Sequence, residues 1–109
     1  MSRPDEDTLE LTLARRLSDV VAGEAATEGE LRLLAEHGDA QRRALEASLR
    51  ASEERLGALA FDPGAAVAEM ASELRRAERL RAELSALRVR LERLEGRSRE
   101  LRGGWLRQR

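Results

Sequence analysis

The sequence contains no cysteine, a single histidine and almost no aromatic side chains, and each shortage excludes a class of protein. Without cysteine there is no disulfide framework, no thiolate nucleophile and no cysteine-ligated metal. One histidine, His37, cannot build a histidine metal cluster, although carboxylates remain as ligands for hard cations. There is no run of about 18 uncharged apolar residues, so we expect no membrane-spanning helix. The acidic N-terminus has no apolar stretch, so we expect no secretory signal.

Lysine, isoleucine and asparagine are also missing, so all 20 basic residues are arginines. An arginine-only chain suggests either recognition of phosphate or carboxylate groups, or a GC-rich coding sequence, since the missing residues have AT-rich codons. The second interpretation is favoured because the bias extends to isoleucine and asparagine, which carry no charge.

What is present is typical of a long-helix or coiled-coil protein. The 109 residues allow at most one domain, and they include 19 leucines, 18 alanines and 38% charged residues. Few residues are β-branched, and no strand pattern occurs. We therefore predict an all-α fold of elongated coiled-coil helices with no sheet. A narrow leucine stripe with little aromatic volume needs another helix packed against it.

Leucines recur at alternating steps of four and three residues between residues 80 and 101, which is the a/d pattern of a heptad. A phase change of three residues precedes Leu80, and such a change locally overwinds a supercoil. A second, shorter run lies between residues 45 and 59, and Ser52 and Ser98 occupy seam positions. The predicted coiled-coil interface consists of Leu45, Leu49, Leu56, Leu59, Met70, Leu74, Leu80, Leu84, Leu87, Leu91, Leu94 and Leu101.

Turn-forming residues divide the chain. Asp62-Pro63 predicts a helix break at residues 61–64, with Asp62 as the N-cap of the next helix. We expect an acidic disordered segment at 1–7, an interrupted helical segment at 8–60, a heptad helix at 65–102 and an Arg-rich tail at 103–109. Gly38, within His37-Gly38-Asp39, indicates a further break, residues 23–29 are another weak point, and Gly103-Gly104 predicts the end of the last helix.

Charges beside the leucine seam bear on the choice of partner. In a parallel homodimer, Glu83 and Arg88 attract across the interface, whereas Arg97 and Arg102 repel. Self-pairing gains nothing from these charges, so we expect a heteromeric coiled coil. Exposed pairs contribute only about 0.2–1 kcal/mol each, so they bias partner choice without deciding it. The flanking charges are Arg81, Glu83, Arg88, Arg90, Glu95 and Arg97.

No chemical site emerges from the sequence. His37 has no nucleophile pattern near it, and no Gly-rich phosphate loop occurs. We expect no enzyme, no catalytic or metal-binding residue, no cofactor and no small-molecule substrate. The arginines alternate with glutamates, which is typical of a solvated flank, so we expect no direct nucleic-acid or membrane binding. Trp105 is either a partner anchor, a seam residue or part of a frayed tail.

Two stretches resemble a known family. Residues 32–37 (RLLAEH) with 43–46 (RALE), and residues 79–87 (RLRAELSAL) with 91–94 (LERL), resemble coiled-coil portions of the kinetochore family called spindle pole component twenty-four. Together the matched residues cover about a fifth of the chain. The resemblance implies a heterodimeric coiled coil with a sister subunit, within the outer-kinetochore complex that links centromeres to spindle microtubules. The family's C-terminal globular head is not matched, so its binding to inner-kinetochore proteins is not carried over.

The sequence therefore leads to two main functional hypotheses, with an Arg-rich binder of nucleic acid or of a membrane surface as a third, which tight binding that weakens steeply with salt would support. The first is a non-enzymatic structural subunit of the kinetochore, located in the nucleus at the centromere and acting in chromosome segregation during mitosis. The alternative is a cytoplasmic helical chaperone or adaptor of a bacterial secretion or flagellar system, with a helical hairpin broken at residues 61–64.

Overall fold

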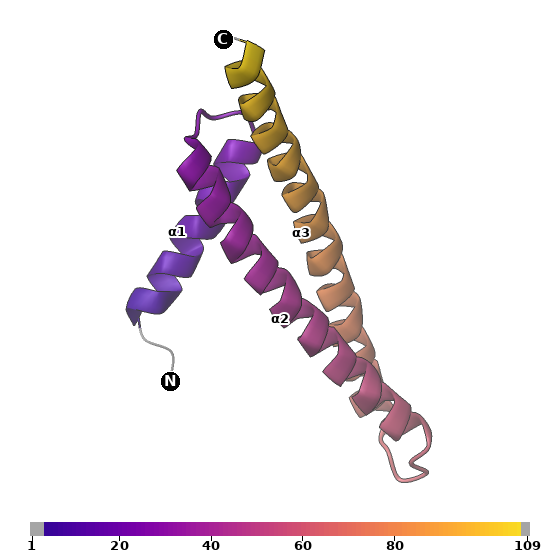
Figure 1. The fold of residues 1–109 in the computed structure, drawn as a ribbon. Helices are drawn as coiled ribbons and strands as arrows, with labels where there is room; N and C mark the ends of the chain where they lie inside the picture. The colour runs from indigo at the N-terminus through magenta and orange to yellow at the C-terminus, as the bar shows by residue number, and fades with distance from the viewer. Residues whose placement is uncertain (1–3, 108–109) are drawn as a thin grey trace. The chain divides into compact units, whose positions relative to one another are not determined.

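The predicted all-α fold is confirmed. The computed structural model describes the backbone from residue 4 to residue 107, and side chains from residue 9 to residue 104. These residues form three helices, α1 (Pro4–Val21), α2 (Glu28–Ala60) and α3 (Val67–Arg107), and no strand (Figure 1).

The chain divides into two compact units. One contains Met1–Asp39 and Val89–Arg109, and is called here the three-helix unit because it includes α1, the start of α2 and the end of α3. The other contains Ala40–Arg88, and is called the hairpin unit because the end of α2 and the start of α3 run side by side in it (Figure 1).

Each unit has a small aliphatic core. In the three-helix unit, α1 and α2 each bury two apolar side chains one turn apart and α3 buries one: Leu17, Val20, Leu31, Leu34 and Leu94. In the hairpin unit the buried side chains on α3 are Ala77, Leu80, Leu84 and Leu87. Each fully buried leucine or valine contributes about 1.5–3 kcal/mol of transfer free energy, so these few residues carry much of the packing energy.

A glycine ends α1. Gly23 has a positive φ of 116°, and its N–H donates to the carbonyl of Val20 at 3.1 Å. The N–H of Glu24 donates to the carbonyl of Asp19 at 3.1 Å. These two bonds form a Schellman motif, which satisfies carbonyl groups at the end of the helix and requires a left-handed residue after it.

We predict that Gly23→Ala destabilises the protein by about 1 kcal/mol or more, because an L side chain strains this backbone conformation. Gly57→Ala is the matched control: Gly57 lies inside α2 with nothing within 4 Å of an added Cβ, so it should gain about 0.5–1 kcal/mol. Urea unfolding followed by circular dichroism measures both. Stabilisation by both changes would contradict the role assigned to Gly23.

Thr27 caps the start of α2. Its Oγ1 accepts a hydrogen bond from the N–H of Glu30 at 3.1 Å, and its carbonyl accepts the N–H of Leu31 at 3.0 Å. Glu28 and Glu30 place negative charge in the first turn, where the helix dipole favours it. The predicted weak point at residues 23–29 is therefore the connection between α1 and α2, at residues 22–27.

The chain reverses at residues 61–66, close to the predicted break. Asp62 is not the N-cap of α3, contrary to expectation. Its Oδ1 accepts the N–H of Gly64 at 2.9 Å and its carbonyl accepts the N–H of Ala65 at 3.1 Å, which makes a turn. Because the turn uses these groups, α3 begins later, at Val67.

Three expected interruptions are wrong. Residues 4–7 belong to α1, and residues 1–3 lie outside the described part of the chain. His37-Gly38-Asp39 lies inside α2, and α3 continues through Gly103-Gly104 to Arg107, so 103–107 is not a tail. A helical glycine costs only about 1 kcal/mol relative to alanine, which good helix formers on both sides and packing outweigh.

Gly38 is buried because α3 approaches it closely. A Cβ at this position collides with the side chain of Leu91. The residue that suggested a break therefore provides space for packing within the three-helix unit.

We predict that the free energy of unfolding of the Gly38→Ala variant is about 1–3 kcal/mol lower than that of the Gly57→Ala variant. Both changes gain helix propensity, but at position 38 the added Cβ clashes with Leu91. Thermal unfolding of the two variants measures the difference. Equal gains would show that Leu91 moves aside at no cost.

Candidate interaction surfaces

The predicted leucine seam packs largely within the chain. On α3, Leu80, Leu84, Leu87 and Leu94 are buried. Leu91 and Met70 are half-buried, as are the four predicted positions of α2, which are Leu45, Leu49, Leu56 and Leu59. Two predicted seam residues remain exposed, Leu74 at 47% and Leu101 at 41%.

Polar contacts define how the helices of the hairpin unit run. The Nη2 of Arg88 lies 3.2 Å from the Oε1 of Glu46, and the Nε of Arg55 lies 3.0 Å from the Oε1 of Glu73. The partner on α3 thus falls in number as the residue on α2 rises, so the two segments are antiparallel. Glu46 also accepts from Arg42 at 2.8 Å, and the hydrogen bonds from Arg88 and then Arg42 lower the pKa of its carboxyl.

A buried hydroxyl lies in the hairpin seam. The Oγ of Ser52 is fully buried and donates to the Oε1 of Glu73 at 2.7 Å. Glu73 is only 17% exposed in its side chain and also accepts from Arg55. The bond from Ser52 is the largest cause that lowers the pKa of Glu73; desolvation opposes it, and Arg55 adds to the lowering. Serine is therefore accommodated at a seam position because a carboxylate satisfies its hydroxyl.

We predict that Ser52→Ala raises the pKa of Glu73 towards its ordinary value, measured by a carbon-13 NMR pH titration of the Glu73 carboxyl. A lowered pKa in the folded state means that the carboxylate stabilises the fold above its unfolded pKa, and that this contribution disappears as pH falls through the folded pKa. Ser52→Ala should therefore reduce the loss of stability on acidification. An unchanged Glu73 titration would contradict this assignment.

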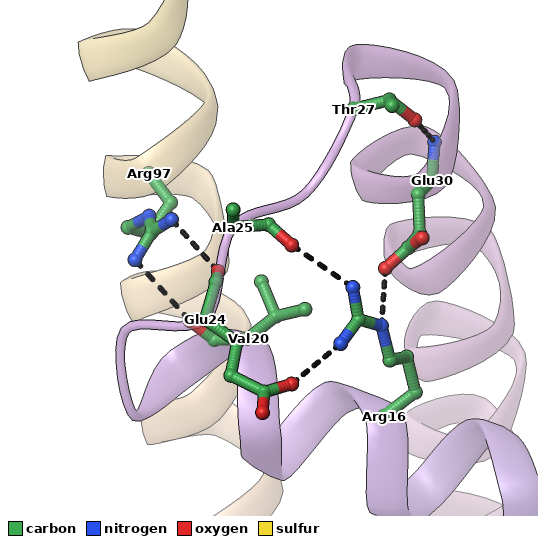
Figure 2. A network of polar contacts seen from close by, with 7 residues as sticks. All are labelled: Arg16, Val20, Glu24, Ala25, Thr27, Glu30 and Arg97. Carbon is green, nitrogen blue, oxygen red and sulfur yellow. Dashed lines mark hydrogen bonds and ion pairs between the residues drawn. The ribbon is translucent and has the colours of Figure 1, made fainter.

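In the three-helix unit, two arginines hold the connection between α1 and α2 (Figure 2). Arg16 donates through its Nε to Glu30, through Nη1 to Glu24 at 2.6 Å, and through Nη2 to the carbonyl of Ala25 at 2.9 Å. Arg97 of α3 donates to the carbonyls of Val20 at 3.4 Å and Glu24 at 3.0 Å. Arg97 thereby places positive charge on the C-terminus of α1, where the dipole favours it.

The charged residues predicted to select a partner differ in whether they form contacts within the chain. Arg88 and Arg97 contact the chain itself, as described above, and Glu95 lies 3.9 Å from Arg99 on the same helix. The other three are exposed and form no ion pair within residues 9–104: Arg81, Glu83 and Arg90.

A groove in the three-helix unit is the other candidate site. Leu31, Leu91 and Leu94 supply apolar lining, and its charged lining residues include both acids and arginines, such as Glu28 and Arg102. Its only hydroxyl is that of Ser98, and no histidine lines it. Within the described residues, no three acidic or histidine side chains lie together as a metal site.

The sequence did not point to several residues whose polar contacts hold the helices in place within each unit. Arg16, Glu30 and Glu73 were not singled out, although the Thr-x-x-Glu spacing at 27–30 is a recognisable capping signal. His37 lies half-buried within α2. The side chain of Trp105 lies outside the described residues, so its role stays a prediction.

No known protein family, no curated protein and no solved structure matches this chain. The resemblance to the kinetochore family therefore depends on the two short stretches alone. None of the helices in the described part of the chain is long and apolar enough to cross a membrane.

Proposed function

We propose that this protein is non-enzymatic and works by binding other proteins through a preformed helical hairpin. The observation that supports this is the burial of Leu80, Leu84 and Leu87 within the chain's own hairpin unit. The hairpin supplies the second helix that the seam requires, and its outer surfaces remain available to partners.

This arrangement favours a helical chaperone or adaptor of a bacterial secretion or flagellar system. Such a protein presents a rigid helical surface to an export substrate, and a preformed hairpin avoids the ordering cost of coupled folding and binding. The proposed location is the cytoplasm.

The second candidate is a subunit of the outer-kinetochore complex, located at the centromere and bound to a sister subunit. The exposure of Leu74 and Leu101 favours it, because these predicted seam residues stay accessible to a partner helix. Full engagement of the seam requires the hairpin to open, which exposes its buried leucines at about 1.5–3 kcal/mol each until a partner covers them.

We predict that the isolated protein is a helical monomer of 12.2 kDa whose unfolding midpoint does not change with concentration. Leu84→Ala should destabilise that monomer by about 2–5 kcal/mol, since Leu84 is only 4% exposed. Leu33→Ala, at an exposed position, should change stability by less than about 0.5 kcal/mol. Sedimentation and thermal unfolding provide the measurements.

The two candidates give different results in the same experiment. A chain that is unfolded alone and becomes helical only when mixed with the proposed sister subunit supports the kinetochore subunit and contradicts the preformed hairpin. A stable monomer that gains nothing from the sister subunit supports the chaperone or adaptor.

A further inference from the structure

The end of the hairpin differs in chemistry from the rest of the chain. Residues 56–68, called here the hairpin tip, contain a single charged residue, Asp62, in a protein of which 38% is charged. Most of these side chains are exposed, including Phe61 at 91% and Val67 at 82%. Phe61 is the chain's only phenylalanine, and its ring contributes nothing to a core.

Exposed apolar patches of this kind mark binding surfaces more often than isolated apolar residues do. The turn that presents the tip is well defined, because Asp62 bonds to Gly64 and Ala65 within it. The patch is therefore preorganised, which reduces the entropy lost on binding.

The charges that border the tip indicate the chemistry of its partner. Glu53, Glu54 and Glu69 lie within one turn of the tip and are exposed, and none forms an ion pair within residues 9–104. The only arginine that close, Arg55, is paired with Glu73 at 3.0 Å. These three glutamates are called here the acidic border.

We propose that the hairpin tip is a docking surface for a different protein that has an apolar socket bordered by arginine or lysine. An anionic membrane surface is disfavoured because it attracts basic residues and repels the acidic border. A symmetric tip-to-tip dimer is disfavoured because it brings two acidic borders together. This inference rests on the proposed function, since it names the surface by which the hairpin binds.

The experiment starts in the native cell with the full chain carrying photoreactive benzoylphenylalanine at position 61, or at position 33 as a control. Leu33 serves as the control because it is also an exposed apolar residue, 53% exposed, and it lies on α2, the helix that ends just before Phe61. A protein that cross-links from position 61 and not from position 33 is then purified, and its affinity for the unmodified chain is measured. Capture alone does not support the proposal.

Support comes from the affinities of purified variants. Phe61→Ser should weaken binding roughly tenfold or more, as expected for a central aromatic anchor, and Val67→Ser should weaken it less. Leu33→Ser should leave affinity within about twofold. The double change Glu53→Lys, Glu54→Lys should weaken binding, and raising the salt concentration should weaken the unmodified complex. Circular dichroism must show the same helicity for all variants.

The opposing results are equally specific. Cross-linking from position 61 to lipid or to a second copy of this chain overturns the proposal, as does a purified partner that binds the Phe61→Ser variant with unchanged affinity. In that last case the chain still binds a protein, so the proposed function stands. If neither position captures a protein and none copurifies with the full chain, the proposed function fails as well.

Discussion

The burial of a leucine seam against the chain's own second helix is the interaction on which the hairpin unit depends. Leu80, Leu84 and Leu87 of α3 are buried there, and the seam leucines of α2 in the same unit are half-buried. The turn at residues 61–66 makes this possible because it reverses the chain and keeps the two helical segments at high effective concentration. Because α2 is tethered to α3, it can occupy the seam ahead of a helix from another chain even when the contacts of the two are equally strong.

Polar contacts add to the leucine packing by positioning the helices and the connection between α1 and α2. The carboxylate of Glu73 satisfies the buried hydroxyl of Ser52, and Arg16 and Arg97 bond to the segment between α1 and α2. Exposed ion pairs add little stability singly. The contacts named above define position, since each joins two helices of one unit or joins a helix to the connection between α1 and α2.

Much of the helical content was predictable because its signals are local. The Asp-Pro-Gly turn, the glycine after α1 and the leucine spacing all act over a few residues. The breaks expected at Gly38 and Gly103 were wrong because glycine has only a modest preference against helix. At Gly38 the cost of a helical glycine is offset because the absence of a side chain lets Leu91 pack closely. Leu91 lies more than fifty positions along the chain, so the residues around Gly38 do not reveal this contact.

The sequence alone determined that the chain is helical, that leucines form a seam, and that a reversal or break lies near residue 62. Only the tertiary structure decided that the seam in the hairpin unit packs against the same chain, and that Phe61 and Val67 remain exposed. Heptad spacing indicates that a helix packs against another helix. It carries no information about which chain supplies that neighbour, because helices of similar pattern fill the same seam with nearly equal contacts.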